Sequence, residues 1–396
     1  MKIIVLGAAG LQGRAALVYL LEQKDVTEIR AADIRDDILK EMAVRLDDER
    51  LSTRYLDLRD YEMSVQAFQG YDVVLNCALT MGGYVKTTKA ALEAGANYLD
   101  LTTKGEREAQ KALDHKFKEK GLVCVQNMGA GPGLTNITAA FLMDKLDQTE
   151  TIDFKMISTD LVPPEEHSKP LYCNITMSDI MYLFSNPTYL YEDGVLKELE
   201  PRAIPEKFTF EEPIGTQIIA GEAHSEPICL SRSFAERGIK RISYKGSFGD
   251  EIEKKMIFLR DLGFGNRNPI EVKGQKVVPF DVLQALVENL PAEKKKEPNF
   301  VGDLIVIVTG VKEGERIEYR LRAVVPPALH KELLDRGCSG SYRAGICASV
   351  TAVMIGRGQV KIKGVVDPEL AIPPDQYLNE LVKFGFNIEI TEKRLL

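Results

Sequence analysis

The chain has 396 residues, of which 44% are hydrophobic and 28% charged, and its formal net charge at pH 7 is −8. This length exceeds one typical hydrophobic core and predicts two domains, while the negative charge disfavours nucleic acid or an anionic membrane surface as a partner. No apolar run is long enough to span a bilayer. Six dispersed cysteines without a Cys-x-x-Cys pair and the lack of a signal-peptide pattern indicate a soluble, cytoplasmic protein.

The first fourteen residues, MKIIVLGAAGLQGR, predict the start of a dinucleotide-binding domain. Residues 2–6 are typical of a buried parallel strand, and a helical pattern follows directly. Three glycines between them would allow a tight turn, close approach of a pyrophosphate and close packing of helix on strand, with the helix N-terminus favouring phosphate. We therefore expect cofactor binding by Gly7, Ala8, Ala9, Gly10, Leu11, Gln12 and Gly13.

The end of the second predicted strand, residues 27–32, bears on which dinucleotide binds. Asp33 stands twenty residues after Gly13, where a carboxylate can accept hydrogen bonds from the ribose diol of NAD. Arg35 is suited instead to the 2′-phosphate of NADP. We expect NAD, with NADP as the alternative, and assign Ile34 to the same site; for Asp33 a purely structural role as a helix cap is the other interpretation.

Strand and helix patterns alternate up to about residue 126, which predicts a doubly wound parallel sheet. Ligands bind beyond the carboxyl ends of such strands. We therefore assign to the cofactor site the residues at the ends of the predicted strands 52–58 and 71–75, namely Asp57, Leu58, Asn76, Cys77, Ala78 and Leu79. The predicted strand 97–101 brings Asp100, Thr102 and Thr103 to the same edge, where we assign Thr102 and Thr103 to the substrate site.

A second glycine-rich segment, NMGAGPGLTN at residues 127–136, follows the predicted strand 122–126. Three glycines and a proline favour a rigid turn with accessible backbone, followed by a helix that Thr135 or Asn136 would cap. A turn of this kind is suited to lie against a nicotinamide ring; a simple linker between domains is the alternative. We assign Gly129 and Pro132 to the cofactor site and Gly133 and Asn136 to the substrate site.

Together, GAAGLQG, NYLDLTT and NMGAGPGLTN resemble the saccharopine dehydrogenase family, in which a similar Pro-Gly turn ends the nucleotide-binding domain. The likeness continues through residues 223–234, 251–264 and 343–369, so it covers nearly the whole chain. Saccharopine-forming members usually carry an acid just before the Pro-Gly pair, where this chain has Gly131. The resemblance thus implies an NAD(P)-dependent enzyme of lysine or related amino-acid metabolism, comparable to lysine 6-dehydrogenase or saccharopine dehydrogenase.

The middle of the chain loses the alternation of strand and helix, and strand-like runs dominate. They predict an α+β substrate domain with a largely open sheet that a second subunit would cover, and the resemblance also implies a homodimer built there. The family architecture implies that the C-terminal segment returns to the first domain. The expected division is therefore 1–136 plus 344–396 for a Rossmann domain and 137–343 for a substrate-binding and dimerisation domain.

The expected reaction is reversible oxidation of a C–N bond in an amino-acid-derived amine, with a nicotinamide cofactor taking the hydride. The four histidines lack metal-ligand spacing, and we expect no metal. Releasing hydride requires a neutral amine, for which Asp100 or His224 would serve as base, and Arg232 and Arg343 are candidates for binding a substrate carboxylate. The alternatives are a carboxynorspermidine-type dehydrogenase acting on a larger secondary amine, and a non-catalytic nucleotide-binding protein.

Overall fold

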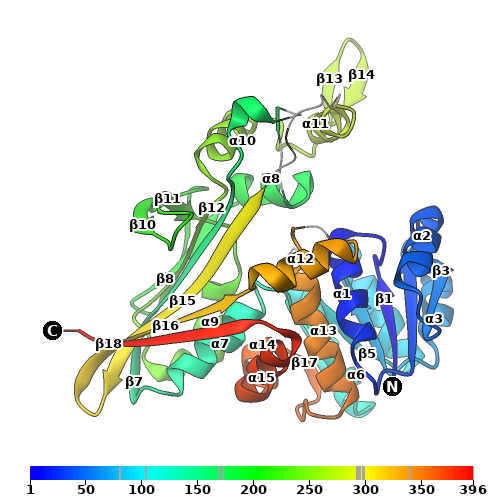
Figure 1. Cartoon of the computed structure of the whole chain (residues 1–396), viewed down its shortest axis with the longest axis horizontal. Coiled ribbons are helices and arrows are strands. Elements are labelled where there is room, and N and C mark those ends of the chain that lie inside the picture. Colours follow the sequence, from blue (N-terminus) through cyan, green and yellow to red (C-terminus); the bar gives the residue numbers. More distant parts are fainter. Residues whose placement is uncertain are drawn as a thin grey trace. The chain divides into compact units, whose positions relative to one another are not determined.

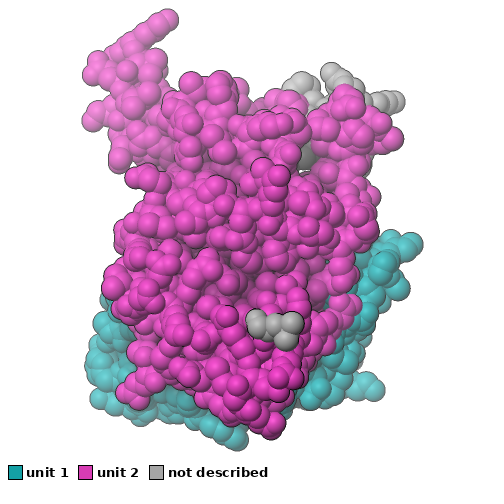
Figure 2. Space-filling model, turned by 90° about the vertical axis from the view of Figure 1, so that its left-hand side faces the viewer, with its two compact units in different colours: residues 1–145, 323–388 teal, residues 146–322, 389–396 magenta. Residues whose placement is uncertain are grey.

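The computed structural model describes residues 1–79, 82–102, 105–167, 170–171, 174–290, 296, 299–338 and 340–395. The chain divides into two compact units, which Figure 2 shows in different colours. Unit 1 contains residues 1–145 and 323–388, and unit 2 contains residues 146–322 and 389–396. No helix in the described part of the chain is both long enough and apolar enough to cross a membrane.

Unit 1 is built on a parallel sheet with the strand order β17-β6-β5-β4-β1-β2-β3 among the described residues (Figure 1). The strands are β1 (Lys2–Leu6), β2 (Glu28–Asp33), β3 (Leu51–Tyr55), β4 (Val73–Asn76), β5 (Asn97–Asp100), β6 (Val123–Val125) and β17 (Gly364–Val366). Order reverses between β1 and β4, and in sheets of this type the ligand binds at such a reversal. This is the doubly wound sheet that the sequence predicts.

Helices cover both faces of this sheet. They are α1 (Leu11–Leu21), α2 (Asp36–Leu46), α3 (Tyr61–Phe68), α4 (Tyr84–Ala94), α5 (Arg107–Lys111), α6 (Asp114–Glu119), α7 (Leu134–Met143), α12 (Pro327–Asp335), α13 (Arg343–Gly356), α14 (Pro368–Ala371) and α15 (Pro374–Phe384). On one face, Ile4 and Val74 pack against Phe68 of α3 and Ala91 of α4 in a single core. Because both faces are covered, the central strands β1 and β4 are almost wholly apolar, whereas β2 and β3 near the edge carry polar residues.

Unit 2 is built on a mixed sheet whose main path, within the described ranges, runs β10-β11-β12-β7-β15-β16-β18, with β8 paired to β12 and β9 paired to β8. Its strands are β7 (Gln148–Asp160), β8 (Thr188–Glu192), β9 (Val195–Leu199), β10 (Glu206–Thr209), β11 (Thr216–Gly221), β12 (Arg241–Ser247), β15 (Phe300–Lys312), β16 (Glu315–Val324) and β18 (Asn387–Arg394). A separate hairpin joins β13 (Ile270–Val272) to β14 (Gln275–Val277).

The helices of unit 2 are α8 (Met177–Ser185), α9 (Glu226–Ser233), α10 (Asp250–Asp261) and α11 (Pro279–Glu288), with short 3-10 turns at Pro164–Glu166 and Ala235–Arg237. Helices α8, α10 and α11 share a core that includes Phe184, Met256 and Phe280. The hairpin β10–β11 packs Phe210 and Ile219 against Ile157, Ile305 and Ile307 of the long strands. The sequence predicts a largely open sheet in this domain, and part of that sheet is covered by the hairpin β10–β11.

The observed boundaries differ from the expected ones at two places. Helices α7 and α12 belong to unit 1, so the chain leaves that unit after residue 145 and re-enters it at 323, where the sequence indicated 136 and 344. The last strand, β18, neighbours β16 in the sheet of unit 2, which removes residues 389–396 from the nucleotide-binding domain. The boundaries of the two units depend on pairing between strands far apart in the sequence, and the local residue pattern does not predict that pairing.

Candidate active site

The glycine-rich turn joins β1 to α1 in unit 1 and is tightly closed. Gly7 has φ +68°, and its carbonyl oxygen accepts the Gly10 N–H at 2.9 Å. A Cβ on Gly13 would stand 2.2 Å from that same oxygen, so only glycine allows the helix to begin this close to the strand. A Cβ on Gly10 would be 3.1 Å from the Gly7 oxygen and 3.8 Å from Arg35 Nη2. Gly10 therefore offers bare backbone next to a guanidinium group, as a dinucleotide pyrophosphate requires.

Asp33, at the end of β2, is part of this turn. Its Oδ2 accepts the Ala9 N–H at 3.0 Å, and its Oδ1 accepts the Arg35 backbone N–H at 3.0 Å and lies 3.3 Å from Arg35 Nε. The residue is only 7% exposed, whereas the Arg35 side chain is 47% exposed. The carboxylate thus fixes the glycine turn and the guanidinium together, and the guanidinium is the more accessible of the two groups. Ile34 between them is exposed.

The other strand ends assigned to the cofactor take different roles. Asp57 accepts hydrogen bonds from Arg59, which hold the pKa of its carboxyl at about 2. Asn76 is 1% exposed; its Oδ1 accepts the Ala78 N–H at 3.0 Å and its Nδ2 donates to the Tyr98 hydroxyl. The Asn76 side chain therefore shapes the loop that follows β4, and Ala78 in that loop abuts Gly7. In the described part of this region, Leu58 and Cys77 are partly buried and Leu79 is exposed.

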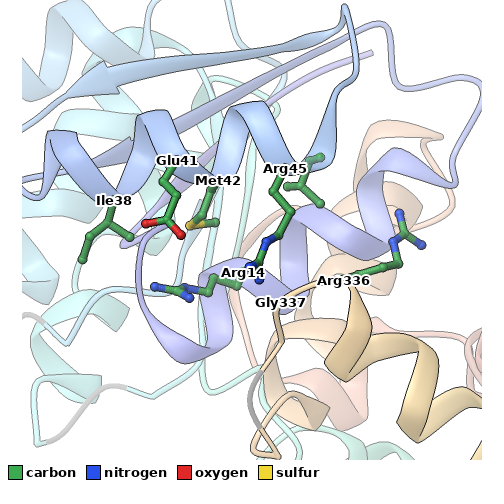
Figure 3. Close-up of a pocket in the computed structure, with 8 residues that line it drawn as sticks. Arg14, Ile38, Glu41, Met42, Arg45, Arg336 and Gly337 are labelled. Carbon is green, nitrogen blue, oxygen red and sulfur yellow. The ribbon is translucent and has the colours of Figure 1, made fainter.

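A hollow lies in unit 1 between the first turn of α1 and the side of α2 that carries Glu41 and Arg45 (Figure 3). Three arginines line it together with one acid and small apolar patches, namely Arg14, Arg45, Arg336, Glu41, Ile38 and Met42. Figure 3 shows the Arg45 side chain extending toward Arg14, whereas Arg336 points away. Arg336 pairs with Glu22, but no ion pair of Arg14 or Arg45 falls within the described residues. The hollow is therefore positively charged.

Asp100, the first candidate base, is completely buried. Its Oδ2 accepts the Gln110 Nε2–H at 2.8 Å and its Oδ1 accepts the Asn127 backbone N–H at 3.1 Å, while Met128 N–H donates to its carbonyl oxygen. Burial raises the pKa of this carboxyl to about 7, although the hydrogen bonds from Gln110 and Asn127 oppose the rise. Asp100 thus anchors the start of the second glycine-rich turn.

The turn itself is held almost entirely by its own backbone. Gly129 N–H donates to the Pro132 carbonyl at 2.7 Å, and Leu134 N–H donates back to the Gly129 carbonyl. Asn136 is fully buried: its Oδ1 accepts the Gly133 N–H at 3.2 Å, and its Nδ2 donates to Glu369. The N-cap of α7 is Gly133 and not Thr135 or Asn136, because the helix already begins at Leu134; Asn136 stabilises this end from the third helical position.

His224, the second candidate base, lies in unit 2 within a buried charge cluster. Its Nδ1 is 3.2 Å from Glu226 Oε2, its Nε2 is 3.5 Å from Glu222 Oε2, and its ring stacks on Tyr244 with 3.7 Å between centroids. The imidazole is 10% exposed, whereas both glutamate side chains are 0% exposed. Arg202 Nη1 donates to Glu222 Oε1 at 3.0 Å.

The remaining predicted residues are scattered. Arg343 begins α13 in unit 1 and is partly buried, whereas Arg232 lies exposed on α9 in unit 2. Thr102 is partly buried, and Thr103 lies outside the described residues. The Gln12 side chain bonds to Ser341 and to the Gly345 N–H, so it ties α1 to α13. Within the described chain, no three His, Cys, Asp or Glu side chains are grouped so that they could hold a metal ion.

Sequence reasoning missed several residues that the structure brings into these clusters. Gln110 and Gln126 are fully buried, and the Gln126 side chain donates to Gln110. Neither had a clear sequence signal, because Gln110 lies on the charged helix α5 and Gln126 follows the short strand β6. Glu222 and Glu226 alternate with His224 in EAHSE, a spacing that could have suggested shared contacts. Arg202 had no local signal, because it reaches Glu222 from a separate loop.

The fold and the glycine cradle define an NAD(P)-binding oxidoreductase with a Rossmann domain and a separate second domain. Two family models match nearly the whole chain: the saccharopine dehydrogenase NADP-binding domain at residues 3–125 and the saccharopine dehydrogenase C-terminal domain at residues 129–386. The chain belongs to the saccharopine dehydrogenase family. The family resemblance seen in the sequence is confirmed, as are the fold class and the prediction of an NAD(P)-dependent dehydrogenase.

Curated relatives match along most of their length. Carboxyaminopropylagmatine dehydrogenase from Synechocystis is 25% identical over 397 residues, covering 97% of this chain and 96% of the relative. Carboxynorspermidine synthase from Vibrio cholerae is 24% identical over 362 residues, covering 87% and 84%. Apo saccharopine dehydrogenase (L-Glu forming) from Saccharomyces cerevisiae matches with a TM-score of 0.74 over 100% of both chains at 14% identity, which shows the shared fold.

Proposed function

We propose that this protein makes or breaks the C–N bond of a secondary amine in which an amino-acid-derived carbon chain is joined to a polyamine-like amine. The observation that carries the proposal is the cradle of Gly10, Asp33 and Arg35 for a nicotinamide dinucleotide. The two relatives named above act on such amines and match over most of their length. Lysine 6-dehydrogenase or saccharopine dehydrogenase activity is the second candidate, supported by the matched family and by the shared fold.

Bound NAD(P) would accept or supply the hydride at the carbon that bears the nitrogen. The chain itself would hold the dinucleotide on the backbone of residues 7–13 and exchange the proton of the amine. For that exchange Asp100 offers a carboxyl whose pKa is raised to about 7, and His224 offers an imidazole that reaches the surface of unit 2. A group with a pKa near the working pH is the most effective proton carrier.

Arg35 and Asp33 would determine whether the adenosine end of NAD or of NADP is bound. The Asp33 carboxylate suits the ribose diol of NAD, but it is nearly buried and already accepts several N–H groups. Arg35 is half exposed beside Gly10, and Arg14 in the neighbouring hollow adds positive charge. We propose that the site accepts NADP as well as NAD, with Arg35 responsible for the 2′-phosphate.

A homodimer and a cytoplasmic location belong to the same proposal. The dimer rests on the family resemblance and on the long strand β16, whose alternating charged residues include Arg320 and Arg322. Light scattering coupled to size-exclusion chromatography would test it, and a single monomer mass at all concentrations would contradict it.

The activity test follows nicotinamide absorbance with purified protein, NAD and NADP separately, and four amines: carboxyaminopropylagmatine, carboxynorspermidine, saccharopine and L-lysine. Reduction of the nucleotide with either of the first two supports the main proposal, and reduction with lysine or saccharopine alone supports the second candidate. No turnover with any of the four, despite measurable binding of the nucleotide, would refute both.

A further inference from the structure

We infer that two buried lysines of unit 2, Lys155 and Lys245, form a binding site for the carboxylate of a small molecule. The inference goes beyond the proposed reaction and does not depend on it, because it uses only residues of unit 2 and the chemistry of their side chains. The two lysines lie on the neighbouring parallel strands β7 and β12, where they are register partners. Register partners place their side chains on the same face of a sheet, so both ammonium groups lie on one side.

The charge around the two ammonium groups is positive. Their side chains are only 7% and 5% exposed, and both donate to a single carboxylate, that of Glu206. Partial burial raises the pKa of Glu206, but the hydrogen bonds from both lysines outweigh this effect and lower it, so the carboxyl is ionised at neutral pH. Two further carboxylates on this face already have arginine partners: Asp153 pairs with Arg241, and Asp303 pairs with Arg322. One positive charge is therefore left over, and buried charge of this kind is costly without a partner.

Most N–H donors of the two lysines are available to a ligand. A lysine ammonium has three N–H donors. Within the described structure each ammonium has one hydrogen-bond acceptor, Oε1 of Glu206 for Lys155 and Oε2 of Glu206 for Lys245. Lys155 also lies 5.8 Å from the centroid of the Phe208 ring, a contact that uses no lone pair. Two N–H donors on each ammonium, four in all, are left to bind a ligand.

A buried hydroxyl lies on the same face. Thr188 Oγ1 is buried and has no hydrogen-bond partner among the residues that the structure describes. A Cβ on Gly221 would stand 2.7 Å from this oxygen, and Gly221 is the register partner of Lys245. The hydroxyl therefore lies on the lysine side of the sheet, where it can donate to a ligand. Glu206, with 31% of its side chain exposed, marks where the site reaches solvent.

The group that completes these donors is a carboxylate. It carries one negative charge, equal to the surplus, and its two oxygens offer about four lone-pair positions for the four N–H donors. A neutral ligand would leave the surplus charge in place, and an ammonium group would be repelled by both lysines. This chemistry fits the carboxylate of an amine substrate and equally that of a separate small molecule. Competition against the substrate distinguishes these two sources.

Calorimetric titration of the full chain with sodium acetate tests the inference, with acetamide as the neutral ligand of the same shape and sodium chloride at equal ionic strength as controls. Lys245→Met keeps the aliphatic stem but removes the surplus charge and two of the donors, and we expect at least about tenfold weaker binding of acetate. Glu206→Gln removes the resident carboxylate and increases the surplus, so it should tighten acetate binding about threefold or more.

Two further variants separate the hydroxyl and the general effect of charge. Thr188→Val removes only the hydroxyl and should weaken acetate binding about threefold. Lys240→Met is the matched control, because Lys240 is 59% exposed and pairs with Glu150 away from the site; it should bind acetate as the unaltered chain does. Far-UV circular dichroism and Tm show whether each variant is folded, and Lys155→Met replaces Lys245→Met if the latter does not fold.

The absence of acetate binding beyond that of chloride would overturn the inference, as would equal binding of acetamide. Unchanged affinity in the lysine variant, weaker affinity in Glu206→Gln or a loss in Lys240→Met would also overturn it. Acetate that competes with the amine substrate and raises its KM identifies the substrate carboxylate as the occupant, whereas binding without any change in KM identifies a separate small molecule. If acetate binds as expected while no amine is turned over, the site holds and only the proposed reaction fails.

Discussion

Alanine at Gly10 and at Gly13 should impair the protein in two different ways, although the two positions are only three residues apart. At Gly13 the added Cβ would lie 2.2 Å from the Gly7 carbonyl oxygen and 2.5 Å from Ala8 Cα, both of them backbone atoms. Relieving this overlap requires α1 to move away from β1, at a cost of about 1–3 kcal/mol or more. At Gly10 the nearest atom would be 3.1 Å away, so the unliganded fold tolerates alanine with little loss.

For Gly13→Ala we therefore expect a fall in Tm of several degrees, at about 2–4 °C per kcal/mol, together with loss of nucleotide binding. For Gly10→Ala we expect an unchanged Tm but at least tenfold weaker nucleotide binding, about 1.4 kcal/mol, because the methyl group occupies the surface that a pyrophosphate must approach. Differential scanning fluorimetry and nicotinamide fluorescence titration measure the two effects separately. Nucleotide affinity that survives Gly10→Ala unchanged would refute the assignment of this turn as the pyrophosphate cradle.

Three further predictions concern charged groups. Arg35→Ala should weaken NADP binding by tenfold or more while leaving NAD within about threefold, and equal losses in fluorescence titrations would contradict a 2′-phosphate contact. Burial raises the pKa of Asp100 from 3.8 to about 7, so the folded state favours the neutral carboxyl. The free energy of unfolding should therefore fall as the pH rises from about 4 to 7, by at most roughly 4 kcal/mol. Asp100→Asn should flatten this pH dependence in chemical denaturation. Asp367→Ala removes the buried carboxylate that lies 2.6 Å from the Arg107 guanidinium, while Glu108 still pairs with Arg107. We expect a loss of about 1–3 kcal/mol in the same assay, and no measurable loss would refute a structural role for this pair.

The nucleotide-binding site was largely predictable because its signals are local. The order strand, glycine turn, helix lies within residues 1–21, and the close contacts of Gly10 and Gly13 with the Gly7 oxygen fall inside that same segment. The position of Asp33 followed from the spacing to the next strand. Its bond to the Ala9 N–H was not predictable, because that bond depends on how β2 lies beside β1.

The clusters that surround the two candidate bases were not predictable, because they join distant parts of the chain. Asp100 meets Gln110 and Asn127 only when β5, α5 and the end of β6 are assembled. His224 meets its two glutamates locally, but Arg202 and Tyr244 come from other elements. Burial converts these polar side chains into networks, and burial is a property of the assembled fold.

The sequence by itself determined the doubly wound sheet, the dinucleotide cradle and membership in the saccharopine dehydrogenase family, because periodicity, glycine spacing and motif order are local properties. Tertiary structure decided what depends on long-range pairing. It added β17 to the edge beside β6, although its three residues carry almost no strand signal. It also gave β18 to the sheet of unit 2, since a strand joins whichever edge satisfies its backbone hydrogen bonds, and residue pattern alone does not specify that edge.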